Sequence, residues 1–239
     1  TMTGSILGRT NGMGGLKKTI TFSDSSTPDN SKIVLTGNII SYGPSSKDGV
    51  SFSRSSGNHV TFTKGSMVGS IIATNSPADK LTGKKGYNNI TFASSSTQTL
   101  TGGILAYDYN NNGDDIRPTN TLTISANTTL QIKANPDESF NTITDSRTYG
   151  RTFTLSTGSI IARGRGANEI NLANSSTLTL DGGIITEDNA KSLITFTGAN
   201  GIINGNITTS GGSATITISN ASSGVVNGNI LSSGSGVNK

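Results

Sequence analysis

The sequence predicts an all-β fold in which short repeats stack into a parallel β-helix, or β-solenoid, of roughly eight rungs. Three observations lead to this prediction. A phrase of glycine, a small residue and isoleucine recurs, a short alternating strand phrase precedes most copies, and no segment shows helical periodicity over eleven or more residues. One such repeat cannot bury its own apolar face, so stacking repeats is the way to cover it.

The Gly-small-Ile phrase sets the period. Its last four glycines stand at 158, 182, 205 and 228, which makes the final intervals nearly constant, whereas the earlier ones are longer. The longest interval, from Gly102 to Gly158, fits two units of about 28 residues if a degenerate copy lies near 130–132. The seven copies are Gly37-Asn38-Ile39, Gly69-Ser70-Ile71, Gly102-Gly103-Ile104, Gly158-Ser159-Ile160, Gly182-Gly183-Ile184, Gly205-Asn206-Ile207 and Gly228-Asn229-Ile230.

Two of these copies are identical NGNI segments, each preceded by a pair of apolar residues. We expect both to occupy the same corner of successive rungs, with Ile207 stacked on Ile230 and Asn206 on Asn229. Glycine permits a positive φ at such a corner, and asparagine hydrogen-bonds to nearby backbone. The apolar pairs 202–203 and 225–226 would form the strand that enters it.

The second phrase alternates apolar and polar residues and is typical of strands. Its copies are Ile20-Thr21-Phe22, Val50-Ser51-Phe52, Ile90-Thr91-Phe92, Ile170-Asn171-Leu172, Ile194-Thr195-Phe196 and Ile216-Thr217-Ile218. The competing fold is one or two antiparallel β-sandwich domains. A sandwich would show hairpins at a spacing of about ten residues and no constant long period, so the nearly constant final intervals favour the stack.

Composition narrows the class of protein. Only 31% of the chain is hydrophobic and 13% is charged. Such values are also typical of disorder, but the apolar residues recur in phase, which favours a narrow core. The chain has no cysteine, which excludes disulfides, thiolate metal sites and thiol catalysis. It contains neither a run of about eighteen apolar residues nor a signal segment.

The charge is mildly basic, with a net charge of +4 and a pI of 9.4. Lysine and arginine are dispersed and are not interleaved with aromatic residues, so we expect no nucleic-acid partner. A mild positive field favours anionic glycans or lipid headgroups at a cell surface.

We interpret residues 1–239 as a single elongated domain, with 1–18 as a less regular entry segment. The repeats differ in length mostly after the Gly-small-Ile phrase. The longest connections there are 41–49, 73–89 and 106–121, and an irregular excursion covers 134–150. Insertions at one corner of each rung emerge along one edge, which is the candidate functional face. The alternative is that this edge merely tolerates insertions.

One of these loops resembles the first half of a calcium loop. Oxygen-bearing side chains occupy positions 1, 3 and 5, and Gly113 occupies position 6. The twelfth position is Thr119, where the motif needs a bidentate carboxylate, so a solvated loop is favoured. Calcium is the only cofactor that the sequence raises, with the candidate ligands Asp108, Asn110, Asn112 and Asp114.

Basic residues gather in two places and form a candidate face for sulfated or sialylated glycans. The alternative is solvated charges spread around the molecule. The first group is four arginines and the second is three lysines in an earlier insertion, and together they comprise Arg147, Arg151, Arg163, Arg165, Lys80, Lys84 and Lys85.

The sequence does not predict an enzyme. His59 is the only histidine, and no Gly-x-Ser-x-Gly elbow is present. A glycan-degrading enzyme would need acidic residues close together. The carboxylates are mostly scattered, and the closest groups lie in apparent loops at 108–115, 137–138 and 187–188.

The repeated LTGNI, NGNI and ITF units, together with the abundance of Ser, Thr, Asn and Gly, resemble the passenger region of bacterial autotransporters. The vacuolating-cytotoxin-like and adhesin passengers are the most similar. The resemblance implies a right-handed parallel β-helix and secretion through an outer-membrane β-barrel. It also implies that the protein is secreted or displayed on the cell surface. It also implies that this chain is a piece of a longer passenger with further rungs, because no translocator is present.

The leading hypothesis is therefore a non-enzymatic passenger segment that acts in adhesion or host-cell binding. The implied partner is a host-cell surface protein or glycan, and self-association is left open. Contact with the membrane would occur only through the missing translocator. The alternatives are a purely structural spacer and a glycan-degrading β-helix enzyme.

Overall fold

The computed structural model is all-β with parallel sheets. It describes residues 2–4, 6–8, 17–22, 34–42, 57–74, 86–108, 118–137, 142–145, 151–218 and 223–239. Strands and turns make up these residues, and none of them forms a helix that is long and apolar enough to cross a membrane.

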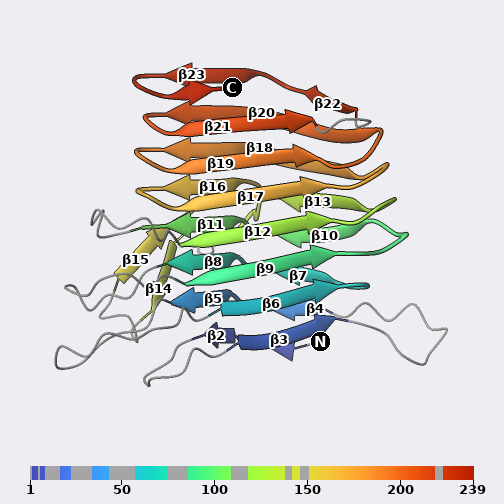
Figure 1. Ribbon diagram of the computed structural model, residues 1–239. Coiled ribbons are helices and arrows are strands. Elements are labelled where there is room, and N and C mark those ends of the chain that lie inside the picture. The colour runs from blue at the N-terminus through green and yellow to red at the C-terminus, as the bar shows by residue number, and fades with distance from the viewer. Residues whose placement is uncertain are drawn as a thin grey trace.

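One strand from each repeat joins an eight-stranded sheet, which we call the front sheet (Figure 1). Neighbouring strands within this sheet are all parallel and pair at equivalent positions. Phe22 therefore lies beside Phe62, and Phe62 lies beside Phe92. The strands are β3 (Lys17–Phe22), β6 (Gly57–Phe62), β9 (Tyr87–Phe92), β12 (Thr119–Ile124), β17 (Ala167–Leu172), β19 (Lys191–Phe196), β21 (Ser213–Ile218) and β24 (Val237–Asn238).

The remaining parallel strands form a fourteen-stranded sheet with two arms. The entry arm holds β1 (Met2–Thr3), β4 (Val34–Thr36), β7 (Ser66–Val68), β10 (Gln98–Thr101) and β13 (Thr129–Lys133). The exit arm holds β2 (Ile6–Gly8), β5 (Ile39–Tyr42), β8 (Ile71–Thr74), β11 (Ile104–Tyr107) and β16 (Ile160–Arg163).

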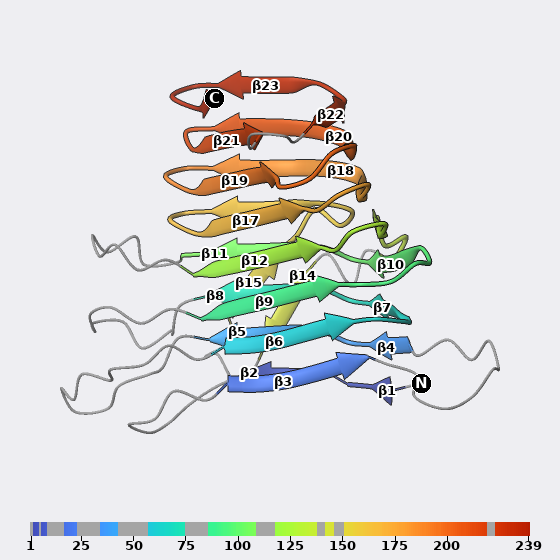
Figure 2. The same ribbon diagram turned by 45° about the vertical axis from the view of Figure 1, so that its right-hand side comes forward.

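Two long strands run through both arms and connect them, namely β18 (Thr177–Glu187) and β20 (Gly201–Ser210). The two halves of β20 pair with β22 (Gly224–Asn227) and β23 (Ile230–Ser233). Successive repeats therefore lie one above another from the N-terminus to the C-terminus (Figures 1 and 2). This parallel pairing excludes the antiparallel sandwich for the described residues.

The Gly-small-Ile phrase marks the corner between the two arms. At Gly69 and Gly102 the backbone φ is +137° and +151°, and a Cβ on Gly102 would lie 1.9 Å from the carbonyl oxygen of Gly69. Each of these corner glycines thus packs directly on the one before it, which excludes any side chain. Gly4 and Ile6 occupy the same position in the first repeat, since Ile6 pairs with Ile39.

The predicted pairing of the NGNI segments is confirmed. Ile207 pairs with Ile230, and Ile202 and Ile203 pair with Val225 and Val226. The backbone N–H of Asn229 donates to Oδ1 of Asn206 at 2.9 Å.

Two predictions from the repeat pattern are wrong. The position assigned to 50–52 is filled by Val60-Thr61-Phe62, which pairs with Ile20-Thr21-Phe22, and 50–52 lies outside the described residues. The long interval between the glycines at 102 and 158 is also one repeat with an insertion. The segment 130–132, where the degenerate copy is expected, belongs to the entry arm, because Leu130 on β13 pairs with Leu178. The exit-arm residue that pairs with Ile104 is Ile160, so no further Gly-small-Ile copy lies between them. The strand at 119–124 is the front-sheet strand that precedes β13 in that repeat.

The main core lies between the front sheet and the two-armed sheet and consists of Ile, Leu, Val, Phe, Met and Ala side chains from successive repeats. A second, smaller cluster lies around the exit arm. It contains Ile40, Ile72, Leu105 and Ile161, and Leu155 packs against them. Leu155 directly follows an antiparallel hairpin of β14 (Thr142–Asp145) and β15 (Arg151–Thr154). Leu155, which lies between β15 and β16, therefore covers part of this apolar surface.

Buried asparagines form a ladder near the start of the front-sheet strands. The side-chain Nδ2 of Asn58 donates to Oδ1 of Asn88 at 3.0 Å, Asn88 donates to Asn120 at 2.9 Å, and Asn120 donates to Asn168 at 3.2 Å. All four are at most 1% exposed, so these hydrogen bonds satisfy groups that water does not reach.

Candidate functional site

The C-terminal ends of the exit-arm strands lie together along one edge, which we call the insertion edge. Because β5, β8, β11, β16, β18, β20 and β23 are parallel and in register, every connection from them back to the front sheet starts there. After β5, β8 and β11 that connection covers 43–56, 75–86 and 108–118, and in the later repeats only 164–166, 188–190, 211–212 and 234–236. The insertions thus leave and re-enter the sheets at one edge, as the repeat pattern predicts.

The short connections share one backbone feature. Each contains one residue with a left-handed φ, namely Gly164 (65°), Asp188 (56°), Gly211 (76°) and Gly234 (58°). Three of them close with a hydrogen bond from the fourth residue of the turn to the first, such as the 2.9 Å bond from the Gly166 N–H to the Arg163 carbonyl. Because these turns are short, no long loop projects from this later part of the insertion edge. The turns expose polar side chains once in each repeat.

A groove of about 600 Å³ follows these turns. Five successive repeats contribute to it, and its surface is mostly polar because the turns supply carboxylates, hydroxyls, an amide and glycine backbone. The lining residues are Tyr107, Asp108, Gly164, Asp188, Asn189, Ser210, Gly211, Gly234 and Ser235.

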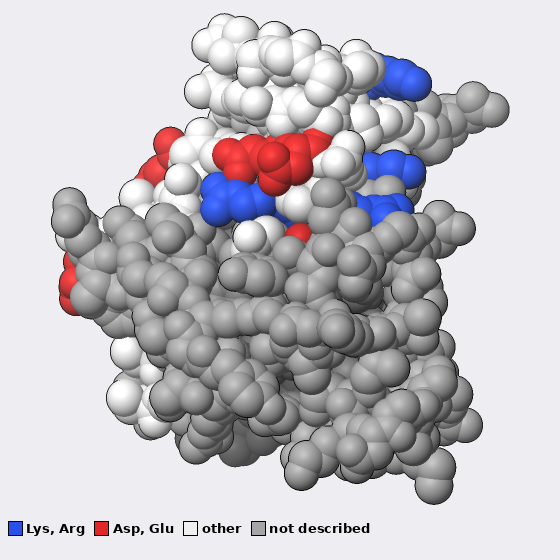
Figure 3. All heavy atoms as spheres, turned by 90° about the vertical axis from the view of Figure 1, so that its left-hand side faces the viewer, with Lys and Arg blue, Asp and Glu red and all other residues white. Residues whose placement is uncertain are grey.

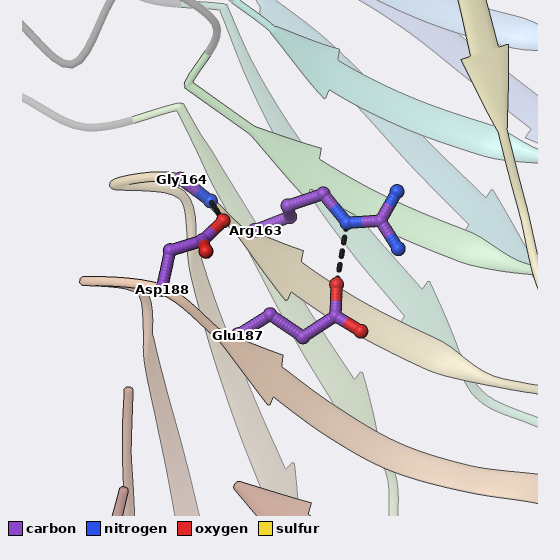
Figure 4. Close-up of polar contacts among 4 residues, drawn as sticks. All are labelled: Arg163, Gly164, Glu187 and Asp188. Carbon is purple, nitrogen blue, oxygen red and sulfur yellow. Dashed lines mark hydrogen bonds and ion pairs between the residues drawn. The ribbon is translucent and has the colours of Figure 1, made fainter. Parts of the chain in front are cut away.

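Charged side chains beside the groove form an ion pair and a hydrogen bond that join neighbouring turns (Figure 4). Arg163 at the end of β16 donates through Nε to Oε2 of Glu187 at the end of β18, at 2.5 Å. Both side chains are about one-third exposed. In the next turn, Oδ2 of Asp188 accepts a hydrogen bond of 3.2 Å from the Gly164 N–H. These contacts connect two neighbouring turns and fix the position of the carboxylate of Asp188.

Asp108 begins the third long connection and is only 2% exposed. Its backbone N–H donates to the carbonyl of Arg163 at 3.2 Å, and a Cβ on Gly164 would lie 2.2 Å from the Asp108 carbonyl oxygen. The chain therefore leaves β11 in close contact with the turn above. Of the predicted calcium ligands, Asn110, Asn112 and Asp114 lie outside the described residues, and among the described ones no group of three or more His, Cys, Asp or Glu is arranged to hold a metal.

The predicted basic face is described in part. Arg163 and Arg165 lie in one short turn, and for Arg151 only the backbone on β15 is described. Arg147, Lys80, Lys84 and Lys85 lie outside the described residues. On the face that carries the insertion edge, one group of basic side chains lies next to acidic ones and other basic side chains lie apart on the right-hand side of the view, so the basic side chains shown do not form an uninterrupted stripe (Figure 3). The ion pair of Arg163 with Glu187 is part of this mixed arrangement.

The only histidine of the sequence, His59, lies on the front sheet. Its ring meets that of Tyr87 on the next strand edge-on, with centroids 5.8 Å apart. Most residues that line the groove do not stand out in the sequence, because Asp188, Ser210 and Gly234 are far apart in the chain. The available signal is their shared position, three or four residues after the isoleucine of Gly-small-Ile.

A comparison of this chain with models of known protein families, with curated proteins and with solved structures found no match.

Proposed function

We propose that this chain is a right-handed parallel β-solenoid segment of a secreted or surface-exposed bacterial autotransporter passenger. The in-register parallel pairing of successive repeats supports a solenoid, and the eight strands of the front sheet suit roughly eight rungs. Right-handed connection between parallel strands is the general rule. The sequence resemblance supports the passenger assignment.

Within this proposal the segment acts in adhesion or host-cell binding and performs no catalysis. The observation that carries the proposal is the origin of the three longest exit-arm connections at equivalent strand ends of adjacent repeats. A stiff stack of sheets would hold these connections side by side, and binding residues are commonly found on loops that a rigid scaffold positions. The partner would be a host-cell surface protein or glycan.

The test replaces the connection 109–117 by the short turn Gly211-Gly212 of a later repeat and measures attachment of the purified chain to host cells. We expect attachment to fall at least tenfold. The same replacement of 75–85 shows whether neighbouring connections share the binding surface.

The matched control removes a segment of similar length at another corner. Replacing 23–33, which connects β3 to β4, by the shorter connection Ala93-Ser94-Ser95-Ser96-Thr97 shortens the chain without touching the insertion edge. Attachment should then be unchanged. Equal attachment by all variants would contradict the binding role and favour a structural spacer.

One observation favours a glycan-degrading enzyme as the second candidate. Asp108 and Asp188 line the same groove although they are far apart in the sequence, and glycoside hydrolysis uses two carboxylates. Release of reducing sugar from host-cell glycans, abolished by Asp188→Asn, would support this candidate. Complete absence of release by the unmodified chain would contradict it.

A further inference from the structure

A second hollow lies on the outer side of the entry arm, away from the insertion edge. Its volume is about 650 Å³, which is in the range of pockets that hold small ligands. It spans three repeats, and we call it the lysine pocket. Its lining residues are Lys64, Gly65, Ser66, Val68, Ser96, Thr97, Gln98, Thr99, Thr101 and Lys133.

Strand alternation explains why the walls of this pocket are polar. On β7 the buried Met67 faces the core, so Ser66 and Val68 face outward. On β10 the buried Leu100 faces the core, so Thr99 and Thr101 face outward in register with Ser66 and Val68. The strands thus present hydroxyl groups at regular separations beside the methyl groups of threonine and valine.

Two cations lie at opposite ends of this surface. Lys64 is in the turn that leads into β7, and the exposed Lys133 ends β13, beside Thr101 in the register. A carboxylate lies just beyond the Lys133 end of the pocket, because Asp181 follows the register partner of Ile132 and accepts a hydrogen bond of 2.9 Å from the Ala134 N–H, so Lys133 lies at the border of the pocket between this carboxylate and the strand hydroxyls. The pocket therefore suits a ligand that carries negative charge at separated points and hydroxyl groups between them.

We propose that the lysine pocket binds a linear acidic polysaccharide. The two ammonium groups bind carboxylate or sulfate groups on separate sugars, and the outward hydroxyls of Thr99 and Thr101 hydrogen-bond to sugar hydroxyls. Val68 and the threonine methyl groups contact the apolar faces of the sugar rings. This site is distinct from the insertion edge, and it does not depend on the adhesion proposal.

The first experiment measures binding of the full chain to a sulfated heparin oligosaccharide, a carboxylated hyaluronan oligosaccharide and neutral dextran by isothermal titration calorimetry. We expect at least one acidic polymer to bind, dextran to bind at least tenfold more weakly, and binding to weaken as salt rises. The sulfated and carboxylated arms distinguish the two sources of negative charge. Failure of both acidic polymers to bind would overturn the proposal.

The second experiment separates a built site from general charge attraction. The double variant Lys64→Gln/Lys133→Gln should lose at least tenfold in affinity. The double variant Lys191→Gln/Lys239→Gln removes the same charge from exposed positions on β19 and at the C-terminus, and its affinity should change less than twofold. Equal losses in both double variants would overturn the proposal, because they would show that net charge alone attracts the polymer.

A third variant tests the strand hydroxyls. Thr99→Val/Thr101→Val keeps the shape and β-branching of both outward side chains, so the fold is retained while two hydroxyls are lost. We expect affinity for the acidic polymer to fall threefold to tenfold, with an unchanged midpoint of thermal unfolding in the absence of polymer. Unchanged affinity would overturn the assignment of these hydroxyls to sugar recognition.

Discussion

Oδ1 of Asn206 accepts a hydrogen bond of 2.9 Å from the backbone N–H of Asn229, which occupies the equivalent position at the next corner. Earlier corners repeat this relationship. Oδ1 of Asn38 accepts from the Ser70 N–H at 2.8 Å, and Oγ of Ser70 accepts from the Gly103 N–H at 3.1 Å. At these corners the middle residue of Gly-small-Ile is therefore an acceptor for the following repeat, which explains why serine and asparagine recur there.

Replacing this acceptor should destabilise the corner according to its burial. Ser70 is 1% exposed and its partner N–H is buried, so Ser70→Ala leaves a buried donor unpaired and should cost about 1 to 3 kcal/mol. Asn206→Ala affects an exposed pair and should cost about 1 kcal/mol or less. Urea denaturation followed by circular dichroism measures both, with the exposed Ser95→Ala as the control. Equal losses for Ser70 and Ser95 would contradict the role of the hydroxyl.

The corner glycines should tolerate no side chain. In Gly102→Ala the new Cβ would lie 1.9 Å from the Gly69 carbonyl oxygen, at a φ of +151°, so we expect a loss of at least about 3 kcal/mol. Gly234 also has a positive φ, but no atom would lie within 4 Å of a Cβ at this position. Gly234→Ala should therefore cost only about 1 kcal/mol. Similar thermal unfolding midpoints for the two variants would count against steric exclusion at the corner.

The regular part of the fold could be predicted because its period is visible in the sequence. The pairing of Ile207 with Ile230 follows from nearly constant intervals and two identical neighbouring phrases. Parallel pairing then follows, since an antiparallel arrangement would place equivalent residues at opposite ends of neighbouring strands.

The irregular repeats could not be assigned from the pattern alone. The segments 50–52 and 60–62 both alternate apolar and polar residues, and only their pairing in space selects Val60-Thr61-Phe62. The interval from Gly102 to Gly158 has the length of two units because the hairpin of β14 and β15 lengthens one repeat between β13 and β16. The groove residues could not be predicted from the sequence for a related reason, since five separate repeats contribute them and none of these repeats contains a local motif.

Three stacked phenylalanines should make the first repeats sensitive to loss of an aromatic ring. The rings of Phe22, Phe62 and Phe92 are nearly parallel, with centroids 4.4 and 4.7 Å apart. Phe62→Ala removes the central, 1% exposed ring and should cost about 3 to 5 kcal/mol. Phe62→Leu should cost about 1 to 2 kcal/mol, because most of the apolar volume stays while the ring contacts are lost.

The control for this prediction is Phe196→Leu, which changes the equivalent position of a later strand. Phe196 pairs in register with Leu172 and Ile218, so leucine suits its neighbours. We expect a smaller loss than for Phe62→Leu in urea denaturation. A larger loss at Phe196 would argue against the importance of the stack.

The ion pair of Arg163 with Glu187 should contribute little to stability. Both side chains are about one-third exposed, so solvent screens their attraction, and exposed pairs typically contribute about 0 to 1 kcal/mol. A double-mutant cycle of Arg163→Gln and Glu187→Gln measures the coupling energy. We expect less than about 1 kcal/mol at low salt and a smaller value in concentrated salt. A coupling of several kcal/mol that persists in high salt would show that this pair is a major structural contact.

The asparagine ladder should be more sensitive in its middle than at its end. Asn120 accepts from Asn88 and donates to Asn168, so Asn120→Val leaves a buried donor and a buried acceptor without their partners. We expect a loss of about 2 to 4 kcal/mol. Asn58 lies at the end of the ladder, and its own buried Oδ1 accepts no hydrogen bond.

Asn58→Val removes this unsatisfied acceptor and leaves only Oδ1 of Asn88 without its donor, so it should cost less than half of the loss at Asn120. The free energy of unfolding of the two variants, measured in urea, decides between a ladder and independent amides. Equal losses would show that the amides act as separate side chains, because only a directional chain of hydrogen bonds makes the middle position depend on two partners and the end position on one.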